Sequence, residues 1–526
     1  MRGRGLYKRG AIARAVIAGV VGVLAVLSGC GGGGDEAELA ELAPPDAPLF
    51  AEVTVRPEED QVEAIEAIAS KAAGISDPGA LLIEEVEESL TIDGADLTWE
   101  EDIEPWLGEH GAFFIRSFQE NGEGGLPDFA AMFQVDDEEL AEDTLNRFAE
   151  ASPDAEPPRS YGGYDYFYGD DDGGYAIGIV EDALVIGTED SFKVAVDALG
   201  GESLAESDEF EKRTEELGDD RLATLYLEPT SVIDAALASG EIERGDARIA
   251  RSLLAGLGSG PLGVGIDASA DSLSVEAVTT VQNEDAIAPD GNLLGELPAG
   301  PAMALALPHL GKTLQLALDR LETSGLPGAE RLRRQIEGFL GIDLQADVAG
   351  WLGDVSAFVR GTSPSDFVFG VVAGATDPEG PRTLIDAARS LIEREEPRVP
   401  IGDPPEGAAY GFTIGVPGLG PSAGAGVFGS DFVASLGVQP QDIRDPDERL
   451  EDDELFADAT EALGGDYDPL FFLDLPKVLP FLEAGGEDEG RDYRELAPYF
   501  EAFRFFIAGA HVEDGLAAVR FAVAVP

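Results

Sequence analysis

The sequence predicts an α+β fold made of two homologous repeats, each a mainly antiparallel sheet with packed helices. Three observations predict this class. Apolar segments of strand length arrive in pairs with short polar connections, as at 175–180 and 183–188, which is typical of hairpins and antiparallel pairing. Helical patterns separate these pairs, as expected for segregated helices and strands. The same motifs also return later in the chain in the same order.

The repeat is most visible in one motif that occurs twice. Ile103-Glu-Pro-Trp106-Leu-Gly108 precedes an apolar segment, and it returns as Val348-Ala-Gly-Trp351-Leu-Gly353, with the two tryptophans 245 residues apart. Further matches have offsets of 238, 246, 247 and 243 residues: Asp128 with Asp366, Asp208 with Glu454, Pro229 with Pro476, and Asp271 with Asp514. Matches in one order at similar spacing indicate two repeats, residues 43–285 and 292–526.

Each half is expected to contain the same series of elements. A short strand leads into amphipathic helices and the Trp-Leu-Gly turn, followed by two apolar strands, a helix, a hairpin region, another helix, one strand, more helix and a closing strand pair. The expected ranges in the first half are 49–55, 138–149 (helix), 175–180, 183–188, 222–227, 262–268 and 273–281. Those in the second half are 302–307, 378–392 (helix), 422–428, 432–438, 470–475, 505–511 and 516–525.

The N-terminus reads as a lipoprotein signal peptide, residues 1–29. Five basic residues and no acidic residue precede a thirteen-residue apolar run, 15–27, which is too short for a comfortable membrane span. The run ends in Leu27-Ser28-Gly29-Cys30, which resembles the lipobox of bacterial lipoproteins, in which the cysteine thiol takes diacylglycerol. The resemblance implies a mature protein that carries palmitate. The alternative is an ordinary secretory signal with an incidental cysteine. Residues 30–42 are expected to form a flexible, solvated tether.

Composition limits the partners of the chain. Cys30 is the only cysteine, so the fold contains no intrachain disulfide. The 104 acidic and 34 basic residues give a formal net charge of −70, which repels nucleic acid and anionic lipid headgroups. We therefore expect the lipid anchor to provide the contact with the membrane, and no nucleic-acid partner.

The mature chain resembles a known family. The segments that carry the resemblance are Leu42-Ala-Pro-Pro-Asp46 through Arg56-Pro57, Trp99 to Gly108, and the strand ending in Leu184-Val-Ile-Gly187. They are similar to the bacterial family called domain of unknown function 3352, over essentially the whole mature chain. The resemblance implies no chemistry and supplies no catalytic residue.

The residues themselves also give no sign of an enzyme. His110, before a strand, His309, opening a helix, and His511, ending a strand, lack metal-ligand spacing and are expected to be surface or boundary residues. Gly424-Ala-Gly426-Val-Phe-Gly429 fits a dinucleotide-loop pattern, but a strand-like sequence follows it, so a hairpin is expected. The acidic clusters at 170–172 and 487–489 are expected to be solvated loops rather than calcium sites. No catalytic residue, metal site or cofactor is predicted.

The predicted function is a non-enzymatic binding or scaffold module, anchored by Cys30 to the extracytoplasmic face of a membrane in the cell envelope. Its partner would be an envelope protein or an apolar ligand. Two alternatives stay open: a carrier of lipid or another apolar ligand, and a solute-binding lipoprotein of a transporter. Trp106 and Trp351 are expected to anchor the core rather than to form binding sites.

Overall fold

The structure of the protein is a computed structural model. It describes residues 37–57, 59–90, 97–117, 127–151, 157–169, 174–218, 221–239, 242, 244–245, 247–248, 250–251, 260–269, 271–281, 291–324, 333–335, 337–339, 341–362, 366–415, 423–484, 502–513 and 515–525. The predicted signal peptide, Cys30 and the acidic clusters at 170–172 and 487–489 lie outside these residues. The chain divides into two compact units, residues 1–282 and 283–526.

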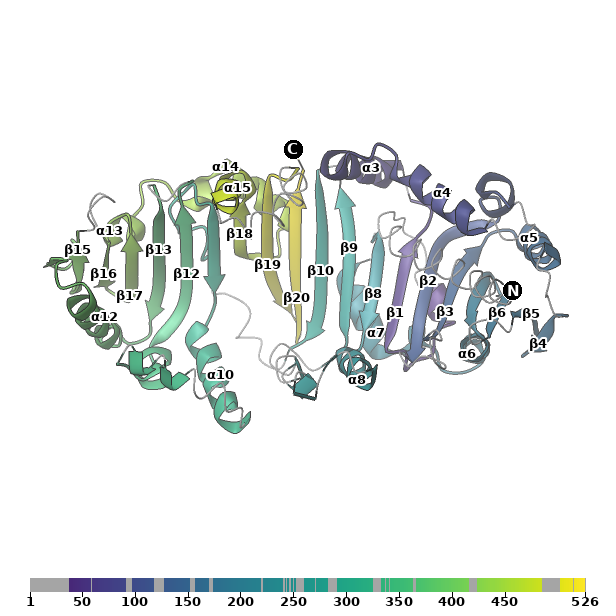
Figure 1. Cartoon of the computed structure of the whole chain (residues 1–526), viewed down its shortest axis with the longest axis horizontal. Coiled ribbons are helices and arrows are strands. Elements are labelled where there is room, and N and C mark those ends of the chain that lie inside the picture. Colours follow the sequence, from purple (N-terminus) through teal and green to yellow (C-terminus); the bar gives the residue numbers. More distant parts are fainter. Residues whose placement is uncertain are drawn as a thin grey trace, which may run out of the picture. The chain divides into compact units, whose positions relative to one another are not determined.

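The first unit contains one antiparallel sheet (Figure 1). Its strands are β1 (Leu49–Thr54), β2 (Leu107–Ser117), β3 (Asp128–Val135), β4 (Arg159–Tyr161), β5 (Tyr164–Gly169), β6 (Tyr175–Val180), β7 (Ala183–Thr188), β8 (Ala223–Leu227), β9 (Leu262–Ser269) and β10 (Ser272–Thr280). They pair in the order β4-β5-β6-β7-β3-β2-β1-β8-β9-β10, each neighbour antiparallel. The helical segments are α2 (Ala37–Ala40), α3 (Glu59–Ala73), α4 (Pro78–Leu90), η1 (Trp99–Ile103), α5 (Glu138–Ala151), α6 (Glu189–Leu199), η3 (Leu204–Glu206), α7 (Asp208–Leu217) and α8 (Pro229–Ser239).

The second unit contains a sheet of the same strand order. Its strands are β11 (Met303–Leu307), β12 (Leu352–Arg360), β13 (Val368–Ala375), β14 (Ile401–Gly402), β15 (Tyr410–Ile414), β16 (Ala423–Phe428), β17 (Asp431–Leu436), β18 (Asp468–Asp474), β19 (Phe505–Glu513) and β20 (Leu516–Ala524). The order is β14-β15-β16-β17-β13-β12-β11-β18-β19-β20, again antiparallel throughout. The helical segments are α10 (Leu310–Ser324), η5 (Leu344–Ala349), α12 (Pro381–Glu395), α13 (Pro440–Arg444), η6 (Leu450–Asp452), α14 (Glu454–Leu463) and α15 (Leu475–Ala484).

Each sheet has one face that packs against helices along most of its strands, which we call the covered face. In the first unit α6 and α7 lie on this face, where Phe50 of β1 meets Phe210 of α7 edge to face with ring centroids 5.6 Å apart. In the second unit α13 and α14 occupy it, and Phe456 of α14 meets Phe472 of β18 at 5.3 Å. Such aromatic contacts add to the apolar area that the helices bury.

The opposite sheet face, which we call the open face, has helices over only part of its strands. Helix α5 of the first unit and α12 of the second pack there against smaller apolar clusters that include Trp106 and Trp351. In the first unit α3 also reaches β9 and β10, where Ala64 and Ile68 contact Ala268 and Leu273. For the second unit, Figure 1 looks onto this face, and no described helix crosses in front of β19 or β20 in that view.

The predicted α+β class and its antiparallel sheets are confirmed. Strands β6 and β7 have the predicted ends, and β14 and β15 are short strands for which no range was predicted. The expected tether differs from the structure at its end, because Leu39, Ala40 and Leu42 are buried in the first unit's core. The acidic residues around these apolar residues made the segment resemble a solvated tether in the sequence. None of the described helices is long and apolar enough to cross a membrane.

Candidate functional site

The repeated tryptophans close two equivalent turns. Trp106 follows the π-helical segment η1, and its indole Nε1 donates a hydrogen bond of 2.5 Å to the carbonyl of Asp102. Trp351 follows the π-helical segment η5 and donates one of 2.6 Å to the carbonyl of Asp347. The two residues are 4% and 3% exposed. Each indole therefore satisfies a carbonyl of the wide turn and fills the junction between that turn and the sheet, which is the expected anchoring position.

The glycines that follow these tryptophans have a different role from the one expected. Gly108 and Gly353 do not form turns, because β2 starts at Leu107 and β12 at Leu352. A Cβ atom on Gly108 would lie 2.7 Å from the Gln134 side chain, and one on Gly353 would lie 3.0 Å from the carbonyl of Gly374. The glycines allow close approach of neighbouring strands.

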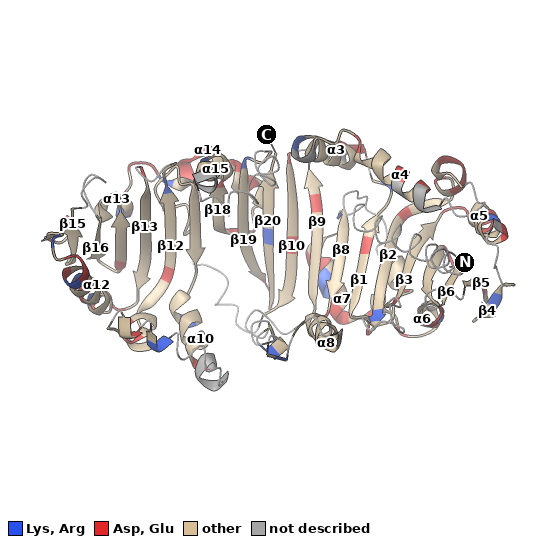
Figure 2. Ribbon diagram, in the orientation of Figure 1, with Lys and Arg blue, Asp and Glu red and all other residues tan. Residues whose placement is uncertain are grey.

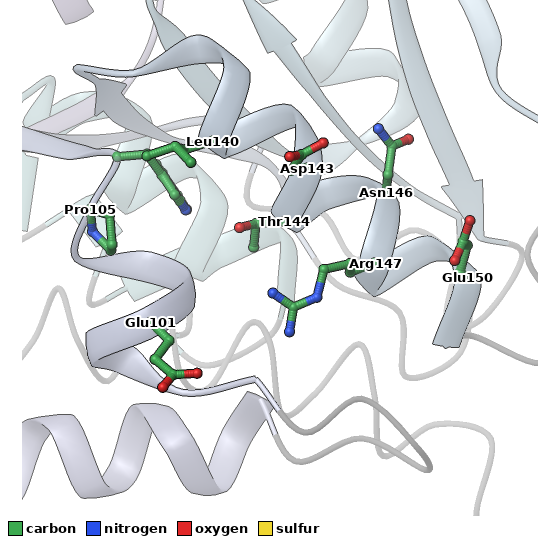
Figure 3. Close-up of a pocket in the computed structure, with 9 residues that line it drawn as sticks. Glu101, Pro105, Leu140, Asp143, Thr144, Asn146, Arg147 and Glu150 are labelled. Carbon is green, nitrogen blue, oxygen red and sulfur yellow. The ribbon is translucent and has the colours of Figure 1, made fainter.

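A hollow of about 420 Å³ lies beside Trp106 at the surface of the first unit (Figure 3). Its lining residues are Glu101, Pro105, Trp106, Leu140, Asp143, Thr144, Asn146, Arg147 and Glu150. Arg147 reaches from α5 and forms an ion pair with Asp102, whose side chain is 3% exposed, while Thr144 Oγ1 donates to the Asp102 carbonyl at 2.9 Å. These contacts fasten α5 to η1, so the polar groups of the hollow serve the packing of two elements. Within the described residues, no group of three or more His, Cys, Asp or Glu is arranged to hold a metal ion.

The histidines are not all surface residues. His110 lies inside β2 and is 6% exposed, which corrects the expected position before a strand; the glycines and acidic residue around it resemble a turn sequence. Its Nδ1 lies 3.6 Å from Oε1 of Glu52 in β1, and its buried Nε2 has no hydrogen-bond partner among the described residues. Burial lowers the pKa of His110, and the charge of Glu109 opposes this shift.

The other two histidines lie near the predicted positions. His309 immediately precedes α10, as predicted, and its Nδ1 lies 3.2 Å from Asp354 Oδ1. His511 lies in β19 two residues before the strand ends, with Nε2 3.4 Å from Glu513 Oε2. The glycine-rich segment from Gly424 forms the β16–β17 hairpin, as predicted, and not a dinucleotide loop.

A buried polar cluster in the first unit joins β3 to β7 and α6. Asp128 is 5% exposed and accepts hydrogen bonds from Ser191 Oγ at 2.5 Å, from Arg116 Nε at 2.7 Å and from Thr188. Burial alone would raise the pKa of Asp128, but these hydrogen bonds and the charge of Arg116 outweigh it and lower the pKa. In the second unit the arginine at the end of the matching strand, Arg360, has a buried Nε without a hydrogen-bond partner among the described residues, and burial lowers its pKa.

A second buried ion pair lies between α7 and β10. Arg221 Nη2 is 2.7 Å from Oε2 of Glu276, whose side chain is 1% exposed, and Arg221 Nε donates to the Leu217 carbonyl at the end of α7 at 2.5 Å. In the second unit Arg520 of β20 donates to the Leu463 carbonyl at the end of α14 at 3.3 Å. Both arrangements satisfy a helix-terminal carbonyl with a cation.

The second unit also exposes apolar side chains on its sheet. The apolar residues on the open face of β11, β18, β19 and β20 form what we call the apolar floor of the second unit, and they are Met303, Leu305, Leu307, Phe471, Leu473, Phe506, Ala508, Ala510, Val512, Ala517, Val519, Phe521 and Val523. The small residues Ala508, Ala510 and Ala517 are themselves buried. Leu307 is 37% and Phe521 is 39% exposed. Phe506 contacts Phe471 and Phe521 with ring centroids 5.7 and 6.0 Å apart. An apolar surface of this kind is commonly a binding site.

Residues 10–380 match the model of a family described as a protein of unknown function, DUF3352. The match covers well over half of the chain and ends within the second unit. The chain belongs to this family. No curated protein sequence matches this DUF3352 chain. It has a distant likeness to a solved structure described as "Structure of crystal form I of TP0453", with a TM-score of 0.24 and 10% identity, covering 47% of this chain and 79% of that chain.

The apolar floor of this DUF3352 protein was not predicted, although the sequence contains a signal for it. The closing strands of the second unit, β19 and β20, are apolar at most positions, so alternation does not show which face is covered. Glycines within them do: a Cβ on Gly263 would lie 2.9 Å from Arg213 of α7, and one on Gly509 would lie 2.6 Å from Leu463 of α14. The glycine-bearing face is thus the face on which a helix packs closely, and the other face is open.

Proposed function

We propose that this DUF3352 protein is an extracytoplasmic lipoprotein, tethered to a membrane through diacylated Cys30, whose folded part is a non-enzymatic binding module. The tethering part is supported by Leu27-Ser28-Gly29-Cys30 at the end of a short apolar run. Two acyl chains on one cysteine suffice for stable anchoring. The binding part is supported by the apolar floor, because such a surface gains stability when a ligand covers it.

We further propose that the two units are homologous repeats, covering residues 43–285 and 292–526 after the signal peptide at 1–29. The shared strand order and the two tryptophan-capped turns support a common origin, since both features also occur in the same chain order. A duplicated unit need not keep its function in both copies, so one unit can specialise in binding.

A carrier of lipid or another apolar ligand is the second candidate, and the apolar floor favours it. A solute-binding lipoprotein of a transporter is less well supported, because such proteins build their lobes largely from parallel strands, whereas every strand pair assigned within each unit is antiparallel. The net charge of −70 opposes nucleic-acid binding in either case.

The tether is tested by metabolic labelling with an alkyne analogue of palmitate in a bacterial host. We expect the full chain to incorporate label and to sediment with membranes, and Cys30→Ser to do neither. Ser28→Ala, which keeps a small residue before the cysteine, is the matched control and should be labelled like the unchanged chain. Equal labelling of Cys30→Ser and the unchanged chain would show that the thiol is not the attachment site.

A further inference from the structure

The apolar floor contains only hydrocarbon and thioether side chains. Strand alternation determines this, because the covered face holds Phe472, Ile507 and Ala522 in the core, and their neighbours along each strand point the other way. The floor continues across β12 and β13, where Val359 pairs with Phe369, which is 37% exposed. The register also places one carboxylate on this face, at the end of β18 beyond its register shift, where Asp468 pairs with Ala510. Burial raises the pKa of Asp468. A ligand that covers the phenylalanines of the floor must therefore be apolar where it contacts them.

The equivalent face of the first unit is better covered. There α3 packs over the ends of β9 and β10 through Ala64 and Ile68. In the second unit α10 follows β11 but packs against β12 and η5 instead of β19 and β20. In Figure 1, α15 lies near one end of the floor strands and α10 near the other.

The charge of the protein limits the ligand further. Acidic residues outnumber basic residues by 104 to 34, and Figure 2 shows Asp and Glu on helices such as α5, α12 and α14, with few charged positions along the strands. A carboxylate or phosphate on the ligand would be repelled by this surface. An uncharged polar end can face water without this repulsion, while the hydrocarbon chain covers the phenylalanines.

We propose that the apolar floor of the second unit binds the hydrocarbon chain of an uncharged amphiphile, such as a monoacylglycerol. This deepens the proposed binding function and rests on it. Phe521 and Phe369 lie at exposed positions of the floor, so they would contact the ligand directly. The first unit would contribute support for the fold but no equivalent site, because α3 covers part of its open face.

The test uses the full chain carrying Cys30→Ser and the uncharged fluorophore N-phenyl-1-naphthylamine as probe. We expect saturable fluorescence that monoolein displaces at a concentration about tenfold lower than oleate does at pH 8, because the carboxylate of oleate is repelled. Phe521→Asp and Phe369→Asp should each weaken probe binding about tenfold or more, since each places a charge in an apolar site. Phe521→Leu keeps the surface apolar and should bind within about twofold of the unchanged protein.

Leu81→Asp is the matched control, because Leu81 is an apolar residue of α4, 51% exposed, outside the floor. It should leave probe binding unchanged, and thermal melting of every variant checks the fold. The proposal is overturned if the probe does not bind, if Phe521→Asp binds as well as Phe521→Leu, or if Leu81→Asp is equally damaging. The proposal is also overturned if the protein does not bind the probe but sediments with phosphatidylcholine vesicles or forms a dimer, and Phe521→Asp abolishes that behaviour. Probe binding without labelling at Cys30 would refute only the tether, and labelling without probe binding would refute only the floor.

Discussion

The first unit buries thirteen polar or charged residues in the described part of the chain, whereas the second buries three. Large exposed apolar residues show the opposite distribution, with Leu81 and Leu140 in the first unit and Leu307, Leu316, Phe339, Phe369 and Phe521 in the second. Both units nevertheless have the same strand order. The same arrangement of strands therefore accommodates more buried polar residues in the first unit and more exposed apolar residues in the second. It can do so because the helices on the covered face supply most of the core in both units.

At one matching position of the two sheets, the first unit has an acidic residue and the second has a basic residue. Glu276 of β10 pairs in register with Gly265, and Arg520 of β20 pairs in register with Gly509, so the two charges occupy the same place in their sheets. The helix-terminal carbonyl is bonded in both units, but the guanidinium comes from Arg221 before β8 in one and from β20 in the other. In both units the helix-terminal carbonyl accepts a hydrogen bond from an arginine, but the arginine comes from a different part of the chain in each.

The partner of the cation changes with its origin. In the first unit Arg221 is neutralised by the buried Glu276. In the second, Arg520 lies over the ring of Tyr467 with its guanidinium carbon 4.5 Å from the ring centroid. An aromatic face replaces a buried carboxylate, which avoids part of the cost of removing two full charges from water.

The largest effect is expected from breaking the buried ion pair of Arg221 and Glu276 in the first unit. Glu276→Arg leaves two cations buried together and should destabilise the first unit by about 5 kcal/mol. Adding Arg221→Tyr recreates the pair of Tyr467 and Arg520 and should recover at least half of the loss. Hydrogen exchange read by mass spectrometry, segment by segment, measures both. A double variant no more stable than Glu276→Arg would show that the two places are not equivalent.

The tryptophan-capped turns should respond alike in the two units. Trp106→Ala and Trp351→Ala each remove a buried ring and should cost about 3 to 5 kcal/mol, with the larger loss of protection in the unit that carries the change. Trp106→Phe keeps a ring but loses the hydrogen bond to Asp102, and should cost about 1 to 3 kcal/mol. Denaturant unfolding monitored by circular dichroism gives these values. Unchanged stability with loss of probe binding would make these residues a site and not an anchor.

The sequence predicts the strand pairs and the tryptophan anchors because both depend on local patterns. Strands β6 and β7 follow from unbroken apolar segments around Glu181-Asp182, and Trp106 from its position between a helical and an extended pattern. Contacts between distant residues leave no such pattern. Arg221 and Glu276 are 55 residues apart, and nothing near either residue indicates the other. The apolar floor is missed for a related reason, since the glycines of the closing strands identify the covered face only once the helices that pack on them are known.

Acid should affect the first unit before the second. Burial lowers the pKa of His110 below its ordinary 6.5, so the unfolded chain binds a proton more readily than the folded one. The stability of the first unit therefore falls as the pH drops from about 6.5 towards the lower folded pKa. The stabilisation from Asp128, whose pKa is also lowered, is present above 3.8 and is lost as the pH falls through its folded value.

Hydrogen exchange of β1 and β2 between pH 7 and 5 measures the histidine contribution. We expect protection to decrease in these strands more than in β11 and β12, where no buried histidine occurs among the described residues. His110→Gln should flatten the difference. An equal pH response of the unchanged protein and His110→Gln would exclude this residue as the cause.

The smallest expected effect concerns the starts of the two π-helical segments. Asp343 precedes η5, and its carboxylate accepts hydrogen bonds from the backbone N–H groups of Gln345 and Ala346, both at 2.9 Å. Thr98 precedes η1 without a side-chain cap, because Glu87 of α4 accepts the N–H of Trp99 at 2.9 Å instead.

Asp343→Ala should therefore lower the denaturation midpoint slightly and loosen η5, whereas Thr98→Ala should leave η1 unchanged. Asp343→Asn is the control, since both N–H groups donate to Oδ1 of Asp343 and an amide oxygen at that place can accept both hydrogen bonds. The backbone hydrogen bonds lower the pKa of Asp343, so the difference between Asp343→Ala and the unchanged protein should disappear as the pH falls through that lowered value. Equal exchange rates in η5 at pH 7 for the unchanged protein, Asp343→Ala and Asp343→Asn would show that the side chain of Asp343 does not stabilise the start of η5.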